Sequence, residues 1–85
     1  MKMNRKEIFQ EVQEILVVSL AVSKDKIPSE STILGDIGAD SLDFPMISKG
    51  LWERFNIEDD IPKNTETVGQ IVTFVEEQLQ VKENV

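Results

Sequence analysis

Apolar residues recur at spacings of three and four along three stretches of the chain, which is the period of an amphipathic α-helix. The first stretch runs from Asn4 to about Ser23, the second follows Ser41, and the third follows Thr67. Their main apolar positions are Ile8, Val12, Ile15, Leu16 and Leu20, then Phe44, Ile47, Leu51 and Phe55, then Val68, Ile71, Val72, Val75 and Leu79. We expect three further residues to pack in the core: Phe9, Val17 and Val18. The pattern predicts an all-α protein, a small bundle of three principal helices.

The first and last helices have clear start signals. Glu7 stands three residues after Asn4, and Gln70 stands three residues after Thr67. At this spacing each side chain can accept a hydrogen bond from the backbone amide of the other residue, as in a capping box. We therefore expect Asn4 and Thr67 to cap these two helices.

The second helix has weaker signals. Cap-type side chains in the run Asp-Ser-Leu-Asp, residues 40–43, favour a start at Ser41. Pro45 is close enough to that start to be tolerated, whereas Gly50 in mid-helix costs roughly 1 kcal/mol relative to alanine. We expect this helix to depend on its buried face.

Two irregular connections join the helices. Residues 24–40 are rich in proline, glycine, serine and aspartate, which predicts a long loop between the first and second helices. Four apolar residues of this loop should be buried as anchors: Ile27, Ile33, Leu34 and Ile37. Residues 56–63 are acidic, end at Ile61-Pro62, and leave room for a short third helix or a turn.

With 85 residues, 40% of them hydrophobic and 29% charged, the chain is long enough for one folded domain. We predict a single domain over residues 1–85, with a core from about residue 4 to residue 80 and a frayed tail from Val81. No apolar run approaches the roughly 20 residues that span a bilayer, and residues 1–6 do not resemble a signal peptide. We expect a cytoplasmic protein without a membrane span.

The chain is strongly acidic, with 9 Lys and Arg against 16 Asp and Glu and a formal net charge of −7. This sign disfavours nucleic acid as a partner. It leaves open either steered association with basic protein surfaces or a simple gain in solubility. The absence of cysteine and histidine excludes disulfides, thiolate nucleophiles, Ser-His pairs and the usual zinc sites. We expect a monomer with no metal site and no catalytic residue.

Ser41 is the candidate for chemistry because it joins a loop to a helix and is flanked by Asp40 and Asp43. Taken alone, such a serine is usually only a helix cap. A phosphate on it would lie at a helix N-terminus, where unbonded amides favour an anion, although the flanking carboxylates oppose it. A hydrolase that uses Ser41 is disfavoured because no histidine could act as its base.

The run Gly38-Ala39-Asp40-Ser41-Leu42-Asp43 resembles the attachment motif of acyl carrier proteins, in which the serine carries 4′-phosphopantetheine. Six further residues match the family pattern in order: Leu51, Phe55, Ile61, Pro62, Thr67 and Val68. The resemblance covers nearly the whole chain. It implies that a phosphopantetheinyl transferase (holo-ACP synthase) moves the arm from coenzyme A to Ser41, and that the thiol of the arm then holds acyl groups as thioesters.

The resemblance also implies a surface for partner enzymes. The acids beside Ser41 would help the transferase, with its magnesium ion, to recognise the serine. The second helix would be read by basic patches on acyl-transferring and ketoacyl synthase-type enzymes. Its exposed stripe should comprise Leu42, Met46, Lys49 and Glu53, while Trp52 lies either at the core edge or in solvent. The expected recognition residues are Asp40, Leu42, Asp43, Met46, Trp52 and Glu53.

Some features depart from the family pattern. Met46 and Trp52 stand where carriers of fatty acid biosynthesis typically have acids, so a specialised, polyketide-type pathway stays open beside fatty acid biosynthesis. The connection between the second and last helices also differs in length. In the family, the acyl chain is often sheltered between the second and third helices, where Ser48 and Gly50 would shape a pocket.

Two other functions share this fold. An arm-free interaction domain would use the second helix only for docking, although the retention of Ser41 disfavours it. A peptidyl or aryl carrier would keep the serine, but the acidity and the Asp-Ser-Leu-Asp sequence favour an acyl carrier. In each of these functions the chain itself is not an enzyme.

Overall fold

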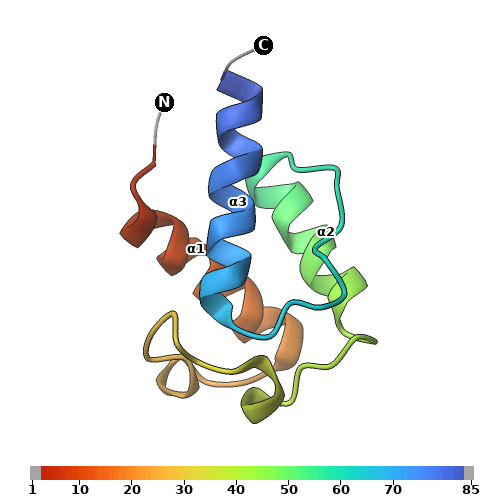
Figure 1. Ribbon diagram of the computed structural model, residues 1–85. Helices are drawn as coiled ribbons and strands as arrows, with labels where there is room; N and C mark the ends of the chain where they lie inside the picture. Colours follow the sequence, from red (N-terminus) through yellow and green to blue (C-terminus); the bar gives the residue numbers. More distant parts are fainter. Residues whose placement is uncertain (1–2, 84–85) are drawn as a thin grey trace.

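The structure is a computed structural model that describes residues 3–83. Its helices in chain order are α1 (Arg5–Leu20), the short 3-10 helices η1 (Lys24–Lys26) and η2 (Leu34–Ile37), α2 (Phe44–Phe55) and α3 (Val68–Glu83). Both α2 and α3 pack against α1, and the long loop between α1 and α2 lies at one end of the bundle (Figure 1). The predicted all-α bundle of three principal helices is confirmed.

The capping boxes of α1 and α3 are both present. At α1, the Asn4 side chain accepts from the Glu7 N–H at 2.8 Å, and the Glu7 carboxylate accepts from the Asn4 N–H at 3.0 Å. At α3, the Thr67 hydroxyl accepts from the Gln70 N–H at 3.2 Å, and Gln70 Oε1 accepts from the Thr67 N–H at 3.0 Å. Each box satisfies amides that the first turn of a helix leaves without a partner.

The predicted start of α2 at Ser41 is wrong, because the helix begins at Phe44. Residues 41–43 instead form a turn, closed by a hydrogen bond from the Asp43 N–H to the Asp40 carbonyl at 2.9 Å. An α-helix through Ser41 would need a donor at residue 45 for the Ser41 carbonyl, and Pro45 has no N–H. The first helical bond therefore runs from the Ile47 N–H to the Asp43 carbonyl, at 3.1 Å.

The core gathers the apolar stripes of the three helices with Ile27, Leu34 and Ile37 of the long loop. Two residues expected there are exposed instead. Ile33 is extended, so its side chain and that of the buried Leu34 point in opposite directions. Val18 falls roughly 120° from the centre of the buried stripe of α1 at 100° per residue. Phe9 and Val17 are partly buried against the core, as predicted.

The long loop is tied to the start of α3, and we call residues 30–34 and 66–69 together the loop–α3 junction. An isolated antiparallel bridge pairs Ile33 with Thr67. Three backbone hydrogen bonds hold the junction: Leu34 N–H to Glu66 O (2.8 Å), Val68 N–H to Thr32 O (3.0 Å) and Gly69 N–H to Glu30 O (2.8 Å). The junction thus supplies partners for backbone groups that a long loop would otherwise leave unsatisfied.

Arg5 fastens the same junction to the first turn of α1. Its guanidinium donates to the Glu30 carboxylate at 2.8 Å, to the Gly69 carbonyl at 3.1 Å and to the Thr73 hydroxyl at 3.0 Å. It also pairs with Glu76 of α3. The hydrogen bond to Glu30 is the main cause that raises the pKa of Arg5, with Glu76 adding to it. One side chain therefore joins α1, the long loop and α3.

Between α2 and α3 the structure has a turn and no helix, closed by the Thr65 N–H donating to the Pro62 carbonyl at 3.1 Å. Ile57 and Ile61 of this connection are buried. Beyond it, α3 continues to Glu83, past the expected fraying at Val81, and residues 84–85 lie outside the described part. Among residues 3–83, no helix has both the length and the apolar character that a membrane crossing requires.

Candidate functional site

The candidate site is the turn that carries Ser41, between η2 and α2. η2 ends at Ile37 and is followed by Gly38, whose φ of 84° lies in the left-handed region that glycine adopts without steric cost. The next residue, Ala39, is buried, and its N–H donates to the Leu34 carbonyl at 2.9 Å. Ser41 follows two residues later and is exposed. The chain is thus anchored immediately before it presents the serine to solvent.

The carboxylates of Asp40 and Asp43 hold this turn through two hydrogen bonds from backbone amides. The Asp40 carboxylate accepts from the Leu42 N–H at 2.8 Å, and the Asp43 carboxylate accepts from the Asp40 N–H at 3.1 Å. This is not a capping box, because the Asp43 N–H donates to the Asp40 backbone carbonyl and not to its carboxylate. Ser41 is not the capping residue, and none of the hydrogen bonds found within residues 3–83 uses its hydroxyl.

The expected support for an anion on Ser41 is weaker than the sequence suggested. The amides of Leu42 and Asp43 already donate to Asp40, and α2 begins only at Phe44. A group attached to the Ser41 oxygen would therefore meet neither unbonded amides at these two residues nor the first turn of α2. It would extend into solvent beside two carboxylates.

The face of α2 that follows this turn is exposed and partly apolar. Leu42 is 86% exposed, Met46 55% and Trp52 51%, and Lys49 and Glu53 are exposed with them. The predicted exposed stripe is confirmed, and of the two placements considered for Trp52 the structure shows the exposed one. Three large hydrophobic side chains thus reach solvent within twelve residues of Ser41.

Arg54 near the end of α2 turns toward α1. Its guanidinium lies 3.0 Å from the Glu14 carboxylate and also pairs with Glu11. Hydrogen bonds to Glu14 and Glu11 raise the pKa of Arg54. Lys49 has no such ion pair within residues 3–83, so it is the positive charge that α2 presents beside the acids of the Ser41 turn.

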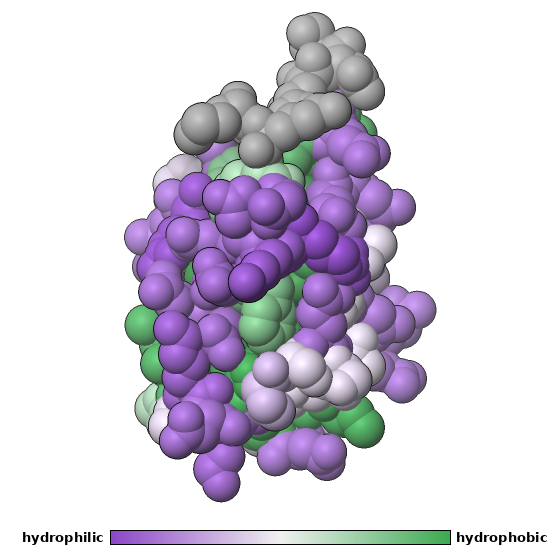
Figure 2. All heavy atoms as spheres, turned by 90° about the vertical axis from the view of Figure 1, so that its left-hand side faces the viewer, coloured by the Kyte–Doolittle hydropathy of each residue, from purple (hydrophilic) through white to green (hydrophobic). Residues whose placement is uncertain are grey.

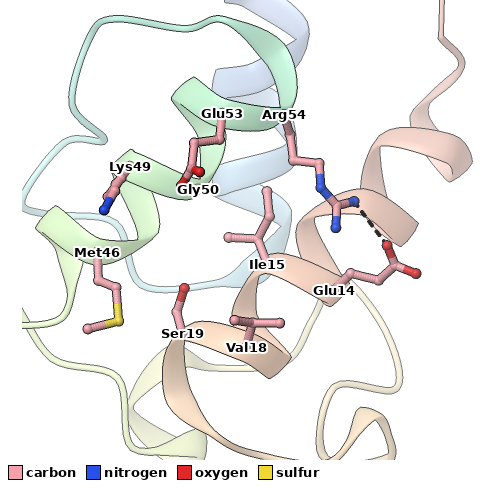
Figure 3. Close-up of a pocket in the computed structure, with 9 residues that line it drawn as sticks. All are labelled: Glu14, Ile15, Val18, Ser19, Met46, Lys49, Gly50, Glu53 and Arg54. Atoms are coloured by element: carbon pink, nitrogen blue, oxygen red, sulfur yellow. Dashed lines mark hydrogen bonds and ion pairs between the residues drawn. The ribbon is translucent and has the colours of Figure 1, made fainter.

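A groove of about 300 Å³ lies between α1 and α2 (Figure 3). Ile15 and Gly50 meet in it, and a Cβ added at Gly50 would lie 2.6 Å from Ile15 Cγ2. Gly50 therefore allows the close approach of α1. It does not face the space between the second and third helices, where the sequence predicted that it would shape a pocket. Ser48 is on another side of α2, where its hydroxyl accepts from the Ile61 N–H at 3.2 Å.

Sequence reasoning missed the part of α1 that lines this groove, notably Val18. The sequence held a signal for this groove. Val18 lies off the buried stripe of its helix, and Gly50 stands in the middle of the following helix. An apolar residue outside the stripe, combined with a mid-helix glycine, indicates a close helix contact with an apolar edge left open.

The fold is a small all-α bundle that exposes Ser41 on the turn before α2, an arrangement compatible with small helical carrier domains. Relatives named acyl carrier protein match over most of the chain. That of Wolinella succinogenes is 38% identical over 71 residues, 81% of this chain and 93% of the relative. A Sulfurovum protein is 39% identical over 71 residues, which cover 81% of this chain and 95% of the relative. The Guillardia theta protein is 35% identical over 79 residues, which cover 91% of this chain and 98% of the relative. No family model matches the chain.

This chain therefore belongs to the acyl carrier protein family, and its role is that of a carrier protein.

Proposed function

We propose that the protein carries acyl groups as thioesters on a 4′-phosphopantetheine arm attached to Ser41. The observation that carries this proposal is the Ser41 turn, which exposes a hydroxyl that makes no hydrogen bond to the described residues 3–83, while its neighbours Asp40 and Asp43 hold the backbone. The chain has no cysteine, so the thiol must come from the arm. The domain, residues 1–85, catalyses nothing itself, and its expected setting is the cytoplasm.

The residues around Ser41 fit such an arm. The serine is exposed, and the amides of Leu42 and Asp43 are already occupied, so the protein would not grip the phosphate. An arm that must visit several enzymes needs this freedom. Its attachment forms a bond between the Ser41 oxygen and the β-phosphorus of coenzyme A, releases 3′,5′-adenosine diphosphate, and transfers the serine proton to a base of the transferase.

Six residues near Ser41 would form the recognition surface for partner enzymes. Five are exposed and Asp43 is partly buried: Asp40, Leu42, Asp43, Met46, Trp52 and Glu53. The acids suit a phosphopantetheinyl transferase and ketoacyl synthase-type enzymes with basic docking patches. Exposed Trp and Met side chains are the kind that dominate small interfaces, so Trp52 and Met46 favour a specialised acyl or polyketide-type pathway over general fatty acid biosynthesis.

Intact mass after incubation with coenzyme A, magnesium and a broad-specificity phosphopantetheinyl transferase tests the attachment. The wild type and Ser31→Ala, an exposed serine of the long loop, should each gain one phosphopantetheinyl group, and Ser41→Ala should gain none. A mass gain in Ser41→Ala would show that the arm is attached to another residue. No gain in any protein, with a transferase active on a control carrier, would instead favour an arm-free docking domain.

A further inference from the structure

The connection between α2 and α3 covers part of the core without forming a helix, and we call its residues 57–65 the strap. It leaves the end of α2 and runs back past this helix to the start of α3 (Figure 1). Ile57 and Ile61 are buried, whereas residues 58–60 and 62–64 are exposed. The two isoleucines belong to the same core cluster as the apolar stripes of α2 and α3. The strap therefore closes the core with two side chains while the rest of it faces solvent.

Two hydrogen bonds within residues 3–83 hold the backbone of the strap. The Ile61 N–H donates to the Ser48 hydroxyl of α2 at 3.2 Å, and the Thr65 N–H donates to the Pro62 carbonyl at 3.1 Å. The first joins the strap to a helix, and the Ser48 side chain that accepts it is buried. A helix of this length would satisfy many of its own amides, which the strap does not. Its closed position therefore depends on the two isoleucines and on Ser48.

The outer surface of the strap adds nothing that would hold it closed. Glu58, Asp59 and Asp60 follow one another, and neither they nor Lys63 form an ion pair within residues 3–83. Neighbouring carboxylates repel one another and do not tie the segment down. The opposite side of the bundle, at the left of Figure 1, contains α1, and hydrophilic residues cover most of that face (Figure 2). A regular helix provides the cover there.

Both ends of the strap are fixed. Before it, the Asn56 N–H donates to the Trp52 carbonyl at 2.8 Å, and the left-handed φ of 58° at Asn56 ends α2. After it, the Glu66 carbonyl accepts from the Leu34 N–H at 2.8 Å. Because α1 packs against both α2 and α3, the strap can leave the core without separating these helices. Its release would be a local opening of the bundle and not its unfolding.

We propose that the strap opens and closes as one unit, with the Ser48 hydroxyl as the latch that holds it closed. Opening withdraws Ile57 and Ile61 together and exposes the apolar sides of α2 and α3 that they cover. The protein can thereby open the space between α2 and α3 while α1 keeps both helices in place. This inference does not need Ser41 to carry anything, so its test is independent of the proposed function.

Amide hydrogen exchange of the unmodified protein, measured by NMR, tests the proposal. The informative probe is the Thr65 amide, because its acceptor lies inside the strap and Ser48 makes no bond to it. Ser48→Ala leaves the Ile61 N–H buried without an acceptor when the strap is closed, so it should raise the Thr65 exchange rate about tenfold. Ile61→Val keeps the latch, removes one buried methyl group and should raise the same rate about fivefold.

Ile27→Val is the matched control, since it removes the same methyl group from a buried residue of the long loop. It should lower the stability of the whole bundle but change the Thr65 exchange rate less than about twofold, because Ile27 is not part of the strap. Circular dichroism checks that each variant is folded. If Ser48→Ala does not fold, the comparison of Ile61→Val with Ile27→Val decides the question.

Three results would overturn the proposal. An unchanged Thr65 rate in Ser48→Ala and Ile61→Val would show that Ile61 and Thr65 do not open together. A Thr65 rate that rises as much in Ile27→Val as in Ile61→Val would show that the strap is released only when the whole bundle unfolds. A Thr65 amide that exchanges in the wild type as fast as in an unstructured peptide would show that the strap is not closed in solution.

Discussion

The loop–α3 junction and the Ser41 turn are both irregular segments, but they are held in opposite ways. The junction is fixed by partners far away in the sequence, since Arg5 bonds to residues 25 and 71 positions along the chain. The Ser41 turn is fixed by Asp40 and Asp43, its immediate neighbours. A change in the junction should therefore be felt in global stability, and a change in the turn only in local opening. Under the proposed function, the residue that carries the arm could then adapt to enzymes without loosening the bundle.

The largest expected effect is that of Arg5→Ala, which removes the side-chain hydrogen bonds that join α1 to the junction. We expect the free energy of unfolding to fall by about 2 kcal/mol, because charged hydrogen bonds to Glu30, Gly69 and Thr73 are lost from a partly exposed site. Urea denaturation followed by circular dichroism measures it.

Arg54→Ala is the matched control for that variant. Arg54 is about as exposed as Arg5 and also joins two carboxylates, but it makes no further bond to a backbone carbonyl or a hydroxyl within residues 3–83, so its loss should cost only about 0.5 kcal/mol. Equal losses in the two variants would show that the junction is no more important to stability than an ordinary surface ion pair.

The next effect concerns the contact that positions α2. Gly50→Ala should destabilise the protein by about 1 kcal/mol. A Cβ 2.6 Å from Ile15 Cγ2 would force the helices apart, and the free-energy cost of that shift should exceed the gain in helix propensity from alanine. Adding Ile15→Leu removes the branched methyl and should recover most of the loss. A single variant more stable than wild type would mean that α1 and α2 are not in tight contact.

The elements predicted well from the sequence are those whose partners are close along the chain. The capping boxes at Asn4 and Thr67 need only a residue three positions away, and the apolar stripes need only their own period. The exposure of Ile33 depends on pairing with Thr67, 34 residues later, which no local pattern reports. The bonds of Arg5 to Glu30 and Glu76 were not predicted for the same reason, since these partners lie far along the chain.

The candidate site shows the same division. Ser41 and its flanking acids stand out in the sequence because the motif is contiguous, and their exposure follows from the loop. Which helix Gly50 faces, and that Val18 lines a groove with Met46, depend on how α1 crosses α2. The predicted start of α2 at Ser41 is wrong for a different reason: the helical bond that Pro45 cannot make is the one to the Ser41 carbonyl, and residues 41–43 form a turn instead.

A smaller effect should distinguish hydrogen bonding from charge at the Ser41 turn. Asp40→Ala removes the acceptor for the Leu42 N–H and should raise the exchange rate of that amide about fivefold, the equivalent of a cap worth about 1 kcal/mol. Asp40→Asn keeps an acceptor oxygen and should preserve the slow exchange. Amide exchange measured by NMR reports both. If Asn behaves as Ala does, the carboxylate charge and not its hydrogen bond orders the turn.

The smallest effect is expected for Pro45→Ala, which tests why the turn is separate from α2. Alanine restores an N–H that can donate to the Ser41 carbonyl, so α2 should lengthen toward Ser41 and the Cα chemical shifts of residues 41–43 should become helical. Global stability should change by less than about 0.5 kcal/mol, because the new helical bond is offset by the greater freedom of the unfolded chain. Unchanged shifts would mean that the hydrogen bonds to the carboxylates of Asp40 and Asp43, rather than Pro45, set the boundary. In that case Asp40→Ala combined with Pro45→Ala should release the turn into the helix, and only the double variant would show helical shifts at Ser41.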